Sequence, residues 1–260
     1  MATAPTLQGP RKILHVRGTW SARDDRTPSA VWLAILWLGM IVGFGLDLHR
    51  FRHETPPAPT ILYVHAVVFT GWMILLTAQV LLVLRNRIAW HRTLGWFVAG
   101  WACLMIVLGP WAAMAGQAVT PNPSSDDTRF LSINIANMSA FVVLLAFGIA
   151  LRKNPAAHRR MMILTTIAIS DPGFARASAY VLPIQPHSAI AWYFLMYYGN
   201  ISLVALMAGW DLWRGRLMRS FVFAATGMLA AEAVASALYF WGPWKAATLN
   251  WVLLWQKHFS

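Results

Sequence analysis

The chain has one cysteine and few charged residues for its length. Of its 260 residues, 12% are charged and 58% are hydrophobic, whereas about a quarter of the residues of a typical soluble domain carry a charge. The single cysteine, Cys103, excludes an intramolecular disulfide and a metal site built from several cysteines. The scarcity of charge predicts a protein that exposes most of its surface to lipid.

Several common motifs of soluble enzymes are also missing. The sequence has neither a Walker-type Gly-Lys-Ser/Thr loop nor a G-x-G-x-x-G fingerprint, which argues against nucleotide binding. It also lacks the G-x-S-x-G elbow of α/β-hydrolases and the His-Glu-x-x-His helix of zinc proteases. Any enzymatic activity is therefore expected to be redox chemistry or chemistry within a membrane.

The hydrophobic residues are concentrated in blocks of about twenty residues. A helix of that length crosses a hydrocarbon core of about 30 Å, so we predict an all-α integral membrane bundle of about seven transmembrane helices. We expect 1–29 to be a flexible basic tail, 30–241 the membrane domain, and 242–260 an amphipathic segment at the outer interface. The predicted spans are about 30–47, 61–84, 94–116, 131–151, 161–182, 189–212 and 220–241.

Basic residues are distributed unevenly between the two sides of this predicted bundle. If the spans alternate, 15 of the 21 Lys and Arg residues lie on the side of the N-terminus and five on the other side, with Arg176 inside a span. Because cytoplasmic loops are enriched in Lys and Arg, we predict a cytoplasmic N-terminus and an external C-terminus. Basic residues in short loops do not form the clustered face of a nucleic-acid binder, so the predicted partner is the lipid bilayer, with other membrane subunits as an alternative.

A small set of polar residues lies inside the predicted spans. Such residues are costly in a membrane and by default indicate a functional site. We therefore predict a buried polar site, or alternatively an internal polar network that only stabilises the bundle. The residues are His65, Gln79, Asn134, Asn137, Asp171, Arg176, Asn200 and Glu232.

The fifth block contains Asp171-Pro172-Gly173 at its middle. Proline removes a backbone donor and glycine loosens a helix, so a break or kink is expected near Pro172. Interrupted helices at mid-membrane hold ions and substrates in many transporters. For Arg176, the first candidate partner is Glu232.

Two histidines occupy matching stretches, RNRIAWHRTLGW from Arg85 and RKNPAAHRRMMI from Arg152. Imidazole is a common ligand of haem and metals, so His91 and His158, together with His65, are candidate ligands of a haem or a copper ion. Alternatively, His91 and His158 lie among lipid headgroups at the first turns of two helices, beside arginines that contact phosphate. Their position next to arginines favours this alternative.

The stretch from about 61 to 180 contains a recognisable set of motif residues: His65, Gln79, His91-Arg92-x-Leu94-Gly95, His158-Arg159 and Arg176. Through these residues it resembles an uncharacterised family of bacterial multi-pass inner-membrane proteins. The resemblance implies a bacterial inner membrane as the location, but it brings no assigned activity. A looser likeness to b-type cytochromes and ferric-reductase-like bundles implies haem, although His65 and His91 lie at opposite ends of one predicted hairpin.

Three functional hypotheses remain open from the sequence. The first is a redox protein that binds haem or a metal ion through histidines. The second is a carrier of ions or small molecules with a polar site near the membrane midplane. The third is a non-catalytic membrane subunit or assembly factor of a larger complex, in which the buried polar residues are structural.

Overall fold

The computed structural model describes residues 25–182 and 186–259, and within these ranges the regular secondary structure is helical, with no β-strand. This confirms the all-α prediction. The helices are α1 (Arg26–Arg52), α2 (Thr60–Leu84), α3 (Ile88–Ala118), α4 (Ser125–Thr128), α5 (Leu131–Ala150), α6 (Pro155–Ile167), α7 (Asp171–Val181), α8 (Ala189–Trp213), α9 (Arg219–Phe240) and α10 (Gly242–Phe259).

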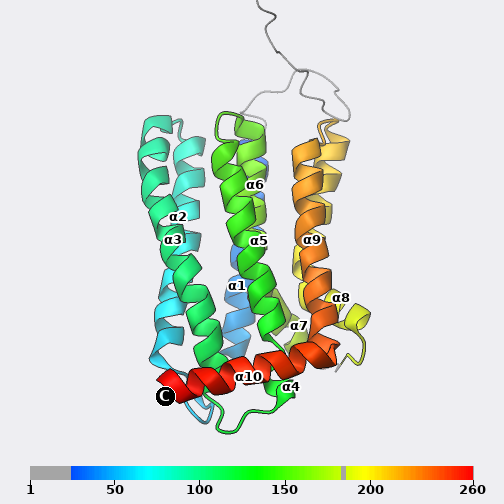
Figure 1. Ribbon diagram of the computed structural model, residues 1–260. Helices are drawn as coiled ribbons and strands as arrows, with labels where there is room; N and C mark the ends of the chain where they lie inside the picture. The colour runs from blue at the N-terminus through cyan, green and yellow to red at the C-terminus, as the bar shows by residue number, and fades with distance from the viewer. Residues whose placement is uncertain (1–24, 183–185, 260) are drawn as a thin grey trace, which may run out of the picture.

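The long helices run side by side as a bundle with two distinct ends (Figure 1). One end carries the α2–α3, α5–α6 and α8–α9 turns, where most of the described Lys and Arg residues lie, and we name it the basic end. At the other end α10 lies across the bundle beside α4, and we name it the α10 end. Of the segment predicted at 242–260, the described residues 242–259 form a helix that crosses one end of the bundle.

Six stretches are long and apolar enough to cross a membrane. They are α1, α2, α3, α8, α9 and the segment Ser125–Ala150, which contains α4 and α5. These helices support a multi-pass membrane protein. The block predicted at 161–182 is not one continuous helix, because it forms α6 and α7 with a turn at 168–170 between them.

The predicted break at Pro172 is present, and its position has a physical cause. Pro172 is the second residue of α7 and has no backbone N–H, so it cannot continue the hydrogen-bond ladder of α6. The last residues before the break instead form short-range bonds, with the N–H of Ser170 donating to the carbonyl of Ile167 at 3.0 Å. Asp171 consequently begins a new helix inside the bundle rather than lying in the middle of one.

The start of the bundle differs from the prediction. Residues 1–24 of the predicted tail lie outside the described residues, but Asp25 and Ser29 are buried, each 4% exposed. The first helix begins at Arg26, and the hydroxyl of Ser29 donates to the carbonyl of Asp25 at 2.7 Å. The assignment of 25–29 to a flexible tail was wrong because the carboxylate of Asp25 forms ion pairs inside the bundle.

Helices α1 and α7 approach each other closely through glycines. A methyl group added to Gly43 would lie 1.8 Å from the carbonyl oxygen of Gly173. Phe174 fits between two further glycines, since a methyl group on Gly39 or Gly199 would lie 2.3 Å or 2.2 Å from its ring. Small residues of this kind allow helix backbones to pack closely in membranes, and here they place α7 between α1 and α8.

We expect Gly43→Ala to destabilise the bundle. The added methyl group would collide with backbone rather than with a movable side chain, and overpacking of this kind costs about 1–3 kcal/mol. The thermal unfolding midpoint in mild detergent, followed by circular dichroism, should fall by several degrees. Gly45→Ala is the matched control, because nothing lies within 4 Å of a methyl group at that position on the same helix; equal midpoints for the two variants would contradict the prediction.

Candidate functional site

Asp171 lies in a polar cluster between α5, α7 and α8. It is the first residue of α7 and is 1% exposed. The side-chain amide of Asn137 on α5 donates to Asp171 Oδ1 at 2.7 Å, and the hydroxyl of Tyr197 on α8 donates to Asn137 Oδ1 at 3.5 Å. The break in the fifth block therefore presents the carboxylate to neighbouring helices.

Glu232 forms the other side of the same cluster. It lies on α9, is 1% exposed, and accepts a hydrogen bond from Nδ2 of Asn200 on α8 at 2.8 Å. Its second carboxylate oxygen, Oε2, and Oδ1 of Asn200 are buried without a hydrogen-bond partner among the described residues. Each of these two hydrogen-bonded side chains thus keeps one acceptor oxygen without a donor. A buried acceptor without a partner is destabilising.

Helix α8 joins the two halves of the cluster. Tyr197, on the Asp171 side, and Asn200, on the Glu232 side, are three residues apart on α8 and are both fully buried. In the part of the chain that the structure describes, neither Asp171 nor Glu232 forms an ion pair with Arg, Lys or His. Two buried carboxylates without a cation favour the uptake of a proton or of a positively charged ligand.

Both interrupted helices border this cluster. The turn at 168–170 precedes Asp171, and α8 has a kink at Tyr197, where φ is −108° and ψ is 15°. Interruptions of this kind release backbone carbonyls from the helical ladder and are found at the ion and substrate sites of transporters. The polar cluster therefore combines buried carboxylates with two places where the bundle departs from regular helix.

The predicted pairing of Arg176 with Glu232 is wrong. Arg176 Nε donates instead to Asp47 Oδ2 at 2.9 Å, its Nη1 donates to the carbonyl of Pro172 at 2.9 Å, and its guanidinium lies 4.6 Å from the ring centroid of Phe44. Asp47 also accepts two hydrogen bonds from Arg50. Arg176 lies beyond the break on the face of α7 toward α1, so it links these two helices.

The remaining predicted site residues lie elsewhere or at the edge of the cluster. Asn134 is half-buried on α5, one turn before Asn137. His65 lies on α2, where its ring stacks on Phe69 with centroids 3.9 Å apart and its Nδ1 is buried without a hydrogen-bond partner in the described residues. Because α2 packs mainly on α1 and α3, His65 does not join the carboxylates.

The structure brings His91 and His158 together at the basic end. Their ring centroids are 6.2 Å apart and the rings are nearly perpendicular. His158 Nδ1 donates to the carbonyl of Gly148 at 2.8 Å. In the orientation that satisfies its amide, Gln79 donates to His91 Nδ1 and accepts from the N–H of Gly95 at 2.9 Å. Both rings are therefore held in place by neighbouring groups.

His65 is not part of this pair. The pair lies at the start of α3 and α6, whereas His65 is in the second turn of α2, at the opposite end of that helix. Within residues 25–182 and 186–259, no three side chains of His, Cys, Asp and Glu are grouped so that they could hold a metal ion. The three histidines proposed as ligands thus divide into a pair and a single residue.

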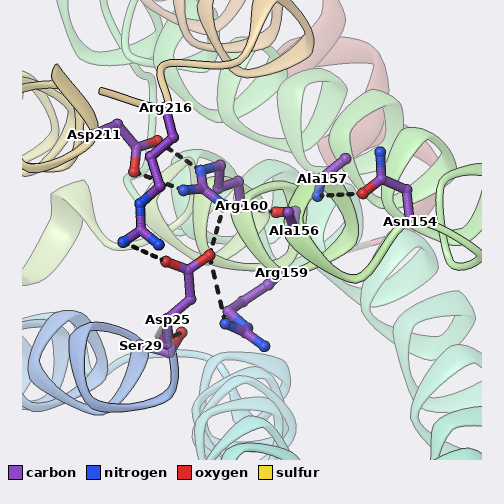
Figure 2. A network of polar contacts seen from close by, with 9 residues as sticks. All are labelled: Asp25, Ser29, Asn154, Ala156, Ala157, Arg159, Arg160, Asp211 and Arg216. Atoms are coloured by element: carbon purple, nitrogen blue, oxygen red, sulfur yellow. Dashed lines mark hydrogen bonds and ion pairs between the residues drawn. The ribbon is translucent and has the colours of Figure 1, made fainter. Parts of the chain in front are cut away.

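A buried ion-pair network at the basic end was missed by the sequence reasoning (Figure 2). Arg160 Nε and Nη2 each donate to Asp211 at 2.6 Å, and Arg160 Nη1 donates to Asp25 at 3.0 Å. The guanidinium groups of Arg216 and Arg159 lie 2.8 Å and 3.6 Å from Asp25. The sequence contained one indication of this network. Asp25 and Asp211, two of only nine acidic residues, lie close in sequence to the basic residues of this end.

No family model matches the chain, and neither a curated protein nor a solved structure matches it. The function is therefore inferred from the chain's own residues. These define a multi-pass helical membrane protein with a buried acidic cluster between α5, α7, α8 and α9.

Proposed function

We propose that the protein is a membrane carrier that binds a proton or a small cation at Asp171 and Glu232. The observation that carries this proposal is the pair of buried carboxylates without an ion-pair partner among the described residues. Glu232 Oε2 and Asn200 Oδ1, which have no hydrogen-bond partner there, supply acceptor oxygens for the bound ion. Oxygen atoms are the ligands that hard cations prefer.

The interrupted helices supply the second part of the proposal. A carrier must expose its site alternately to the two sides of the membrane, and in many carriers the site lies where helices are discontinuous. The turn before Asp171 and the kink at Tyr197 allow the segments on either side to reorient without breaking long helical ladders. Asn137, Tyr197 and Asn200 then orient the two carboxylates during binding.

The proposed topology has seven crossings of a bacterial inner membrane. Six are the long apolar helices and the seventh is α6 followed by α7. The excess of Lys and Arg at the basic end supports its placement in the cytoplasm, and the family resemblance supports the bacterial membrane. Helix α10 then lies on the outer surface, where its exposed Trp251, Leu253 and Leu254 contact lipid.

The carrier proposal is tested by reconstituting the purified full chain into liposomes that contain a fluorescent dye sensitive to protons, Na⁺ or K⁺. An imposed gradient of protons, Na⁺ or K⁺ should dissipate faster than in protein-free liposomes. If none of these three gradients dissipates faster, the proposed function is contradicted. Co-purification with a larger complex, combined with no flux, would instead support a role as a non-catalytic subunit.

The histidine pair supports a second candidate, a redox role with a haem or copper ion between His91 and His158. Its basis is the 6.2 Å separation of the two ring centroids and the hydrogen bond that His158 Nδ1 donates to the carbonyl of Gly148, since an outer acceptor of this kind orients a ligand imidazole. Protein extracted in mild detergent should then show a haem absorption band or bound copper, and His158→Ala should abolish it. A colourless, metal-free preparation would remove this candidate.

A further inference from the structure

A small cavity lies beside the buried ion-pair network at the basic end. It is bounded by α1, α6 and α8, and its volume is about 20 Å³. Its wall includes four charged residues and two tryptophans: Asp25, Arg159, Arg160, Asp211, Trp32 and Trp210. A cavity of this size holds one group about as large as a water molecule.

Within the described part of the chain, the side chains around this cavity include more positive than negative groups. Among the described residues, three guanidinium groups, those of Arg159, Arg160 and Arg216, surround the carboxylates of Asp25 and Asp211 (Figure 2). The guanidinium of Arg160 donates hydrogen bonds to both carboxylates and to the carbonyl of Ala156. The carboxylates are thus shared among cations, and an additional anion at this place would be stabilised electrostatically.

Buried N–H donors beside the network also lack acceptors. The indole Nε1 of Trp210, a residue of the cavity wall, is buried and has no hydrogen-bond partner among the described residues. The same holds for Nε of Arg216 and Nε of Arg26. A buried donor without an acceptor destabilises the structure, so these groups favour a ligand that brings acceptor oxygens rather than donors.

The rest of the cavity wall is mostly apolar. Pro28, Ile163 and Met207, together with Ser29, complete the lining. On the same end of α8, Leu212 and Trp213 are exposed, Trp213 to 73%. The charged cavity matches the headgroup of a phospholipid, and the apolar surface with its exposed tryptophan matches the acyl chains. In other membrane proteins, basic pockets between helices on the cytoplasmic side bind lipid headgroups.

We propose that this cavity binds a phosphate oxygen of an anionic phospholipid. The oxygen enters the cavity and accepts a hydrogen bond from Trp210 Nε1, while the rest of the headgroup lies over the cluster of guanidinium groups. The acyl chains follow the apolar surface of α1 and α8. This site is separate from the carrier site at Asp171 and Glu232, and it concerns the basic end only.

The test is the thermal unfolding midpoint of the full chain in mild detergent, titrated with phosphatidylglycerol, phosphatidylcholine or inorganic phosphate. Phosphatidylglycerol should raise the midpoint by several degrees, whereas the other two should leave it unchanged. Trp210→Phe keeps the ring and removes the donor. Because a hydrogen bond to a charged group contributes at least about 1.5 kcal/mol, this variant should raise the half-saturating lipid concentration about tenfold or more.

Trp96→Phe is the matched control, since Trp96 lies on α3, does not line the cavity and is exposed to 71%. Its half-saturating concentration should equal that of the unchanged protein. Stabilisation by inorganic phosphate that Trp210→Phe weakens would replace the lipid with free phosphate as the ligand. Equal stabilisation by phosphatidylglycerol and phosphatidylcholine, or the same titration for Trp210→Phe and the unchanged protein, would overturn the proposal.

Discussion

Glu232→Gln is expected to reduce ion flux through the reconstituted protein at least about tenfold while leaving the fold intact. Glutamine has nearly the shape of glutamate, and its amide oxygen can still accept the 2.8 Å hydrogen bond from Asn200. It removes the negative charge, however, and with it the group that exchanges a proton or attracts a cation. A loss of about 1.4 kcal/mol in binding is already a tenfold change.

The same measurement should be made on Asp171→Asn, which keeps an acceptor for the amide of Asn137. If the two carboxylates form one site, each single variant and the double variant should lose flux to a similar extent, because residues that act as a unit have non-additive effects. If Glu232 alone binds the ion, Asp171→Asn should retain flux. Either result assigns the binding group.

The control for these variants is Glu54→Gln, which removes an exposed carboxylate near the end of α1. Its flux should match that of the unchanged protein, so that a general change in net charge does not explain the loss. Circular dichroism should show unaltered helix content in all variants. Flux through Glu232→Gln and Asp171→Asn equal to that of the control would remove both carboxylates from the transport site, even if the protein is a carrier.

Arg160→Met is expected to have the largest effect on stability. Arg160 and Asp211 are 6% and 3% exposed, and the guanidinium donates to both oxygens of Asp211 and to Asp25. Removing one partner of a buried ion pair costs about 3–5 kcal/mol, because the remaining charge is left uncompensated. The thermal unfolding midpoint should therefore fall by roughly 10 °C.

The double variant Arg160→Met/Asp211→Leu separates two explanations of this loss. If the cost arises from an uncompensated buried carboxylate, the double variant should recover much of the stability, since an apolar pair of similar volume often replaces a buried ion pair without loss. If the ion pair itself positions α6 against α8, the double variant should remain as unstable as the single one. Asp126→Asn, at an exposed ion pair with Lys245, should leave the midpoint unchanged.

Block length and composition were sufficient to predict the helical membrane architecture. The break before Asp171 was also predictable, because Pro172 and Gly173 weaken a helix wherever they occur in its interior. The sequence likewise indicated that Asp171, Asn137, Asn200 and Glu232 are buried together, since polar groups within membrane spans face the interior. These properties depend on local chemistry and on the membrane environment.

The pairings between helices were not predictable in the same way. Arg176 pairs with Asp47 rather than Glu232 because the break changes the direction in which α7 faces, and because α1 continues past the predicted end at residue 47. Asp25 was assigned to a tail because the residues around it are polar, and only the packed structure shows that arginines of α6 and of the α8–α9 turn neutralise it. Both errors concern the rotation of helices, on which composition carries no information.

The contact between Gly43 and Gly173 also sets how the bundle can deform. The backbones of α1 and α7 touch there, and the ion pair between Asp47 and Arg176 joins them again one turn further along α1. Two connections of this kind oppose sliding or rotation of the short helix on the long one. We therefore expect α1 and α7 to move as one unit about the turn at 168–170, so that a tilt of α1 would shift the carboxylate of Asp171.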